Sequence, residues 1–318
     1  MQTGTYRHCL VGPGRLGSSL LRALADASQD VAAVGVRRAS ALDTAATPPR
    51  LVPADAVRRA LSEAGRPLVL WLTVPDDAIA AVAAETAAVA GGVDASSLVA
   101  VHCSGLMGLG QLAPWRQAGA QVVSLHPLQS FAPLAVRDVE HPEPDPLDGV
   151  PVAVTAATPQ AEAAGTALAE VIGGRPFLLN ESDKPLYHLA AAVASNLLVA
   201  LQSQAGELMR QATHGGSVTA ALELLAPLVR TSLENALRLG PQRALTGPVA
   251  RGDAGSVRAH LALLRHEPAR LGAAYCSLSL QALALAAPRL DDETVQTLQG
   301  LLGGYPDQVT DTGAEAST

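Results

Sequence analysis

The sequence predicts an α/β domain built on a mainly parallel sheet, followed by an all-α domain. Three observations carry this prediction. Up to Asn180, short apolar runs alternate with stretches of helical pattern, which is typical of strand–helix–strand units. The GxGxxG motif "GPGRLG" directly follows the first apolar run. From Lys184 to Leu302 the alternation is gone and the pattern is nearly all helical.

The elements of the first domain follow from run length and flanking residues. Strands are expected at residues 8–12, 31–36, 67–74, 96–105, 120–127, 149–156 and 175–180. Helices are expected over residues 15–27, 76–89 and 159–172, and an exposed acidic loop over 137–149. In the second domain, breaks between helices are expected at residues 213–216, 239–255 and 286–292.

The change from alternating strand and helix patterns to helices alone also predicts the domain boundaries. We expect a dinucleotide-binding domain over residues 1–180 and a helical domain over residues 181–306. The polar segment over residues 307–318 lacks large apolar side chains, so we expect it to be disordered.

The amino-acid composition argues against several classes of protein. Of 318 residues, 48% are hydrophobic and 16% are charged, which is enough apolar material for a sizeable core. The net charge of −7 and the lack of a basic stripe argue against a nucleic-acid partner. Three widely spaced cysteines fit a reducing compartment, with Cys9 and Cys276 expected in the core. The N-terminus has no signal-peptide pattern, and the longest apolar run, residues 186–201, is interrupted by polar side chains. We therefore expect a soluble, cytoplasmic protein without a membrane partner.

The glycine motif stands between a predicted strand and a predicted helix, as a dinucleotide site requires. Gly12 permits the sharp turn, Gly14 lets the backbone approach a pyrophosphate, and Gly17 allows the helix to pack on the strand. The phosphates would lie on the free amides at the helix start, beside Arg15 and Leu16.

The end of the second strand indicates which dinucleotide binds. An NAD site usually carries Asp or Glu there to bind the ribose 2′-hydroxyl. This chain instead has Arg37, Arg38 and Ser40, which suit a 2′-phosphate. The sequence therefore predicts NADP(H).

Further candidates lie at the ends of later strands, where ligands bind in open parallel sheets. Thr73, Val74 and Pro75 are expected to run along the cofactor. In "HCSG", Ser104 would hydrogen-bond the substrate near the nicotinamide, with His102 on the same face. His126 ends another strand and is a second candidate for a direct role, although a histidine there is often only a satisfied cap.

These motifs together resemble a known family. "VGPGRLGSSL", "LTVPDDAI", "HCSGLMGLGQL", "SLHPLQSF", "YHLAAAVASNLLVAL" and "LTGPVARGD" are similar to Rossmann-like proteins with a DUF2520 domain. That family is similar to pyrroline-5-carboxylate reductases, ketopantoate reductases and the wider 6-phosphogluconate-dehydrogenase-like superfamily. The resemblance implies an NADP-binding domain followed by a helical domain for substrate and dimerisation, so a homodimer is expected.

The resemblance also directs attention to the first long helix. Related dehydrogenases carry Lys and Asn one turn apart there, but this chain has Ala192 one turn before Asn196. On an α-helix Lys184, His188 and Ser195 would lie within about 40° of one another, with Asn196 some 80° from His188. Histidine side chains commonly donate protons near neutral pH, so His188 is the candidate proton donor. Lys184 is either a surface residue, a carboxylate-binding group or an alternative donor.

The loop "LTGPVARGD" lies near the cleft in related folds. Arg251 would neutralise a substrate carboxylate, and Asp253 would cap the next helix. No metal-binding pattern is expected, since His260 and His266 are six residues apart and do not share a helix face.

The resulting hypothesis is an NADP(H)-dependent oxidoreductase. Hydride would pass to a C=O or C=N carbon of a small carboxylate, with His188 as donor and with Asn196 and Ser104 orienting the reacting group. Ketopantoate is the first substrate considered, a cyclic imine such as pyrroline-5-carboxylate the second and a prephenate-type reaction the third. A non-catalytic NADP-binding redox sensor is the alternative from another class. Substrate identity, reaction direction and oligomeric state stay open.

Overall fold

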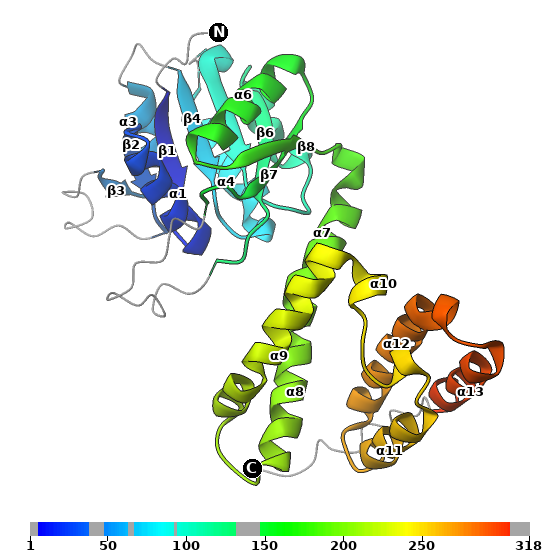
Figure 1. Ribbon diagram of the computed structural model, residues 1–318. Coiled ribbons are helices and arrows are strands. Elements are labelled where there is room, and N and C mark those ends of the chain that lie inside the picture. Colours follow the sequence, from blue (N-terminus) through cyan, green and yellow to red (C-terminus); the bar gives the residue numbers. More distant parts are fainter. Residues whose placement is uncertain (1–5, 38–47, 63–66, 92–93, 132–146, 306–318) are drawn as a thin grey trace. The chain divides into compact units, whose positions relative to one another are not determined.

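The computed structural model describes residues 6–37, 48–62, 67–91, 94–131 and 147–305 (Figure 1). Contacts between Cα atoms divide the chain into two units, Met1–Leu197 and Leu198–Thr318. The first unit holds the sheet and the first turns of the long helical segment, and the second unit is helical. This division falls within the long helical segment, whereas the change from strands to helices occurs after Leu178.

The first unit is built on an eight-stranded sheet in the order β3-β2-β1-β4-β5-β6-β7-β8. Neighbouring strands are parallel except for β6 and β7, which are antiparallel. The mainly parallel sheet expected from the sequence is therefore confirmed. The strands are β1 (Arg7–Val11), β2 (Asp30–Gly35), β3 (Arg50–Leu51), β4 (Leu68–Leu72), β5 (Leu98–His102), β6 (Gln121–Pro127), β7 (Pro151–Ala156) and β8 (Arg175–Leu178).

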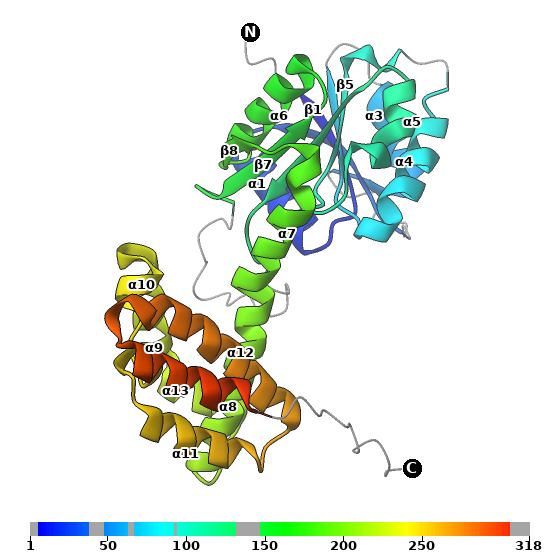
Figure 2. The same cartoon turned by 90° about the vertical axis from the view of Figure 1, so that its right-hand side faces the viewer.

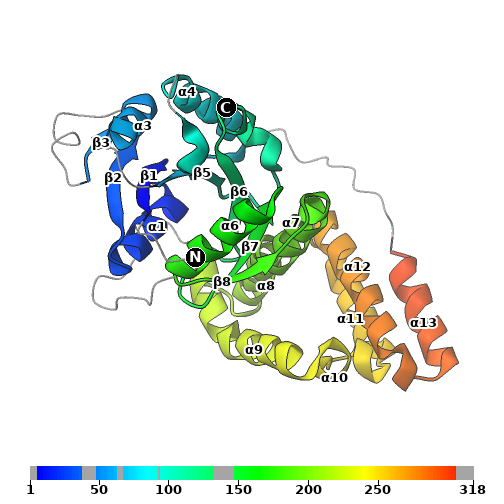
Figure 3. The same cartoon turned by 90° about the horizontal axis from the view of Figure 1, so that it is seen from above.

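Helices cover both faces of this sheet (Figures 2 and 3). One face packs against α3 (Pro53–Ser62), α4 (Ile79–Ala88) and α5 (Ala113–Gln117); the other packs against α1 (Arg15–Asp26) and α6 (Pro159–Val171). All five residues of β4 are consequently buried, as the apolar run LVLWL requires. Leu70 and Leu72 point into one core and Trp71 into the other.

Sequence patterns missed β3 and α5, which have two and five residues, and also missed α3, which has ten. Most of the loop expected over residues 137–149 and the tail expected over 307–318 lie outside the described residues.

The second unit consists of helices around a small core. Its helices are α8 (Leu198–Ala212), α9 (Val218–Leu239), α10 (Pro241–Ala244), α11 (Ala254–Leu264), α12 (Ala269–Ala286) and α13 (Asp292–Gly303). Cys276, Leu283 and Leu298 are among the buried core residues, as expected for Cys276. The Asp253 carboxylate accepts a hydrogen bond from the Ser256 amide at 3.0 Å, which confirms it as the cap of α11.

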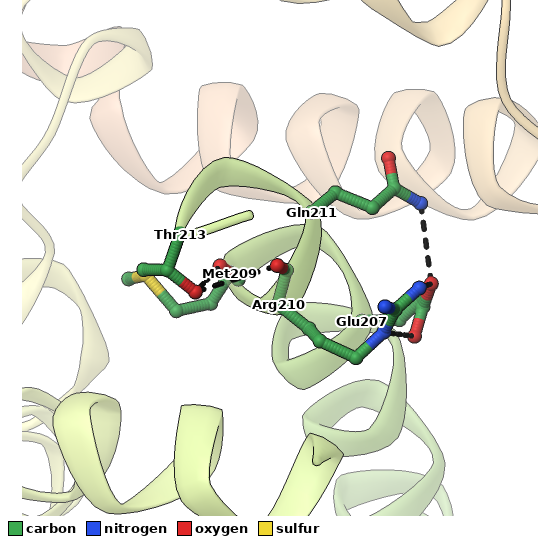
Figure 4. A network of polar contacts seen from close by, with 5 residues as sticks. All are labelled: Glu207, Met209, Arg210, Gln211 and Thr213. Atoms are coloured by element: carbon green, nitrogen blue, oxygen red, sulfur yellow. Dashed lines mark hydrogen bonds and ion pairs between the residues drawn. The ribbon is translucent and has the colours of Figure 1, made fainter. Parts of the chain in front are cut away.

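Near its C-terminal end, α8 carries a polar network (Figure 4). Arg210 donates from Nε to Glu207 at 2.8 Å, and Gln211 donates to the same carboxylate at 3.3 Å. Thr213 donates to the Met209 carbonyl at 2.9 Å. These contacts stabilise the end of the helix, where carbonyl groups lack partners within the helix.

Two helical segments, Glu181–Ala212 and Ala269–Arg289, are long and apolar enough to cross a membrane by length and composition alone. Core helices of soluble proteins pass the same test, so this observation is weak. In the first segment, polar side chains such as His188 and Asn196 interrupt the apolar run.

Candidate cofactor and substrate site

The glycine motif forms the expected turn between β1 and α1. Gly12 has φ of +96°, a region that favours glycine, and a Cβ there would lie 2.8 Å from Val74 Cγ1. A Cβ on Gly17 would collide with the Gly12 carbonyl oxygen. At Gly14, in contrast, a Cβ would meet no protein atom within 4 Å. Gly12 and Gly17 are thus needed for packing inside the protein, whereas Gly14 borders open space.

Thr73, at the end of β4, holds this turn in place. Its hydroxyl donates to the Gly12 carbonyl at 2.6 Å, and its amide donates to the Val11 carbonyl at 2.9 Å. The side chain predicted to run along the cofactor therefore also fixes the loop that would carry the phosphates.

A cleft of about 480 Å³ opens beside the turn. It lies at the carboxyl ends of β1 and β4, where the strand order reverses, which is where ligands bind in open α/β sheets. Its lining includes six of the residues predicted to bind the cofactor, together with residues from the ends of β5 and β6. The lining residues are Gly14, Arg15, Leu16, Thr73, Val74, Pro75, Asp76, Cys103, Ser104, Ser130 and Phe131.

The residues predicted to recognise the 2′-phosphate follow β2. Arg37 is exposed two residues beyond the end of that strand. Arg38 and Ser40 lie outside the described residues.

Ser104 is the centre of a polar network in the cleft wall. Its hydroxyl donates to Asp76 Oδ2 at 2.7 Å and accepts from the amides of Leu106 at 3.1 Å and Met107 at 2.9 Å. Pro75 occupies the cap position of the short helix Asp76–Ala78, and no side chain caps that helix. Asp76 instead binds Ser104, twenty-eight residues away.

Lys184, the only lysine in the chain, lies beneath Ser104 and is 1% exposed. Its Nζ donates to the Ser104 carbonyl and to the Ser124 hydroxyl, both at 2.9 Å. Burial lowers the pKa of Lys184 to about 8, while the carboxylates of Glu181 and Asp76 act to raise it. Lys184 is therefore a buried group, not a surface one, and two of its three N–H donors are engaged inside the protein.

His102 supports the same turn from within the core. It is fully buried, and its Nδ1 accepts from the Ser104 amide at 3.2 Å. Burial, followed by the positive charge of Lys184, lowers the pKa of His102 to about 4, so the ring is neutral near pH 7.

His126 and His188 meet at Gly105. A Cβ on Gly105 would lie 2.9 Å from His126 Nε2 and 3.1 Å from His188 Cδ2. His126 Nδ1 is 2.7 Å from the Tyr187 hydroxyl, and the two rings are edge-to-face. Burial lowers the pKa of His126 to about 4, with the charges of Lys184 and His188 acting in the same direction. Lys184 and His188, from the first turns of α7 (Lys184–Ala192), thus reach the turn after β5, while Tyr187 contacts His126 on β6.

Glu181 adds a second link between this turn and the start of α7. Its carboxylate accepts from the Leu109 amide at 2.7 Å and packs against Gly108, where an added Cβ would collide with that carboxylate. Sequence reasoning missed Glu181, Ser124 and Tyr187, because each acts through a partner remote in sequence.

Ser195 and Asn196 lie in a π-helical turn, Val193–Leu197. The angles between their side chains and that of His188 were predicted for an α-helix and therefore differ here. A π turn advances each residue by less than the 100° of an α-helix. Asn196 therefore rotates back toward the His188 side, and Ser195 rotates away from it. Ser195 is half-buried and Asn196 is exposed. π turns occur often at functional sites.

Arg251 ends the short helix Val249–Arg251 in the second unit and is exposed there. His260 is bonded to the Tyr275 hydroxyl at 2.9 Å. Among the described residues, no group of three or more His, Cys, Asp or Glu side chains is placed to hold a metal ion.

Two protein-family models match different parts of the chain. Residues 1–127 match the Rossmann-like domain, and residues 150–282 match the domain of unknown function DUF2520. The chain is a Rossmann-like and DUF2520 domain-containing protein. Among curated proteins, none matches this Rossmann–DUF2520 chain.

Several solved structures share the fold. A Bacteroides fragilis protein proposed to be an NADP oxidoreductase matches with a TM-score of 0.64 and 20% identity, over 88% of this chain and 98% of that one. A Thermotoga maritima protein matches with a TM-score of 0.58 and 20% identity, over 93% and 98%. Plasmodium falciparum pyrroline carboxylate reductase with NADP bound matches with a TM-score of 0.54 and 12% identity, over 92% and 98%. At these identities the likeness establishes the fold alone.

Proposed function

We propose that this Rossmann–DUF2520 protein is an NADP(H)-dependent oxidoreductase acting on a C=O or C=N carbon of a small carboxylate substrate. The observation that carries the proposal is the cleft, which joins the glycine turn to Ser104 and Asp76 at the point where the strand order reverses. Such a cleft suits a dinucleotide whose reactive end reaches the polar network.

The choice of NADP(H) rests on Arg37 at the end of β2, together with Arg38 and Ser40 in the sequence. Guanidinium groups bind a 2′-phosphate well and offer little to a bare ribose. The Plasmodium falciparum reductase of the same fold has NADP bound, which agrees with this choice.

His188 is the better of the two candidate proton donors. It is half-buried beside Gly105, whereas Lys184 is almost completely buried and engaged by Ser104 and Ser124. Lys184 then has a positioning role, because its two hydrogen bonds fix the residue that lines the cleft. Asn196 would orient the reacting group, with His126, Ser195 and Arg251 as further substrate contacts.

Turnover measurements test this function. NADPH oxidation by the purified protein would be followed against ketopantoate first, then against pyrroline-5-carboxylate and other cyclic imines, with prephenate and NADP⁺ for the reverse direction. Turnover of any one compound supports the reductase. Tight NADPH binding without turnover on the whole panel favours the redox-sensor alternative.

We also propose a homodimer in the cytoplasm. Large apolar side chains on α9, including Leu224, Leu228 and Leu237, are 64% to 79% exposed, and a partner subunit would cover such a surface. Light scattering of the purified protein checks this, with a monomer at micromolar concentration as the contrary result.

A further inference from the structure

Asp76 occupies a distinctive place in the cleft. It follows β4, on the far side of the strand-order reversal from Arg37, which follows β2. A dinucleotide bound at such a reversal places one mononucleotide over each half of the sheet. If Arg37 takes the adenosine 2′-phosphate, as the proposed function requires, the nicotinamide half lies over β4 and β5, next to Asp76.

The hydrogen bonds of Ser104 determine which acceptor atom the cleft presents to a ligand. The single hydroxyl hydrogen of Ser104 goes to Asp76 Oδ2, and the hydroxyl oxygen accepts from two backbone amides. Ser104 therefore has little capacity left for a ligand. Asp76 is held by Ser104 at one oxygen, and within the described chain no residue bonds Oδ1. The acceptor that the cleft presents at this point is the Asp76 carboxylate.

The negative charge of Asp76 makes this acceptor selective for cationic ligand groups. Asp76 is the only acidic side chain among the described residues that line the cleft, and Arg15 is the only basic one. Arg15 lies beside Gly14, at the phosphate end. The positive charge of Lys184 is directed at the Ser104 carbonyl and the Ser124 hydroxyl. A ligand group next to Asp76 therefore meets a fixed negative charge in a partly desolvated wall.

We propose that Asp76 forms a subsite for a cationic nitrogen beside the nicotinamide, an inference that rests on the proposed function. Two sources share this chemistry. One is the positively charged ring nitrogen of the oxidised cofactor, and the other is the iminium or ammonium nitrogen of a substrate. A keto acid places no cation there, so the subsite favours C=N over C=O substrates when the second source applies.

The test compares wild type, Asp76→Asn and Asp77→Asn. Asn is isosteric and keeps an acceptor for Ser104, while the exposed Asp77 is a matched control of equal charge. Dissociation constants are measured for NADPH and NADP⁺ and then, with NADPH bound, for protonated pyrrolidine and its neutral analogue cyclopentanol. Loss of one charge contact should weaken a cation by on the order of tenfold and leave neutral ligands within about twofold.

The outcomes distinguish the cofactor from the substrate as the source of the cationic nitrogen. Weaker NADP⁺ binding in Asp76→Asn alone identifies the cofactor ring as the cation, and weaker pyrrolidinium binding identifies the substrate. Equal affinities for both cations in wild type and Asp76→Asn, with NADPH still bound, overturn the subsite and leave the proposed function intact. No NADP(H) binding by wild type overturns the proposed function and the subsite with it. Asp76→Ser serves as a second charge-removing variant where Asp76→Asn does not fold.

Discussion

The Nζ atom of Lys184 lies 2.9 Å from the carbonyl oxygen of Ser104, a residue eighty positions away in the sequence. This bond joins the start of α7 to the turn after β5, and so to the wall of the cleft. The ammonium group is almost completely buried, where an ion is costly unless its donors are satisfied. The contact therefore positions Ser104 at some cost in stability.

Lys184 should impose a pH dependence on stability. Its pKa is about 8 in the folded protein against an ordinary value of 10.5, so between these values the unfolded chain binds more protons. The unfolding free energy contributed by this group should rise with pH from about 8 to 10.5 and stay flat below that range. Urea titrations at several pH values test this, with Lys184→Met as the comparison. Lys184→Met should lack the rise, and an identical pH profile in both proteins would contradict the pKa shift.

Gly105 should be intolerant of any side chain. Gly105→Ala places Cβ 2.9 Å from His126 Nε2 and 3.1 Å from His188 Cδ2, so the two rings must move. We expect turnover to fall by about tenfold, because even a small displacement of a reacting group weakens catalysis. NADPH affinity should change little. Gly110→Ala is the matched control, since a Cβ there meets nothing within 4 Å.

The hydroxyl of Thr73 should matter for cofactor affinity. Thr73→Val keeps the shape but loses the 2.6 Å bond to the Gly12 carbonyl, which leaves the glycine turn less fixed. We expect NADPH to bind roughly tenfold more weakly, in line with a lost hydrogen bond. Thr73→Ser retains the hydroxyl and should bind like wild type. Calorimetric titration measures both, and equal affinities for all three proteins would remove this role.

His188 should act in turnover and not in cofactor binding. His188→Ala should lower kcat by about 100-fold or more, the usual contribution of a general acid, with the NADPH dissociation constant nearly unchanged. His126→Gln is informative beside it, because His126 is already neutral near pH 7. The fall in kcat should be larger in His188→Ala than in His126→Gln. Wild-type turnover in His188→Ala would exclude His188 as the donor.

Short-range patterns in the sequence predicted the parts of the structure that depend on neighbouring residues. Gly12, Gly14 and Gly17 lie within one turn, and Thr73 ends an uninterrupted apolar strand, so spacing and the flanking elements predicted their places. Apolar alternation likewise located most of the strands, but β3 has only two residues and gives no periodic signal.

Long-range pairs could not be predicted in this way. Asp76 bonds Ser104 and Lys184 bonds Ser124 across separations of 28 and 60 residues, which only the strand order brings together. The angles expected for Ser195 and Asn196 hold only on a regular α-helix. The π turn at Val193–Leu197 changes them, and it has no sequence signal comparable to proline or glycine.

The most direct test of the account is an NADPH titration of wild type and Gly14→Val. A Cβ at Gly14 would meet no protein atom within 4 Å, so the variant should fold like wild type. That same open space is where the pyrophosphate would lie, so NADPH binding should be lost or weakened by about 100-fold or more. Wild type should prefer NADPH over NADH. Undiminished NADPH binding in a folded Gly14→Val protein, or no binding by wild type, would contradict the central claim.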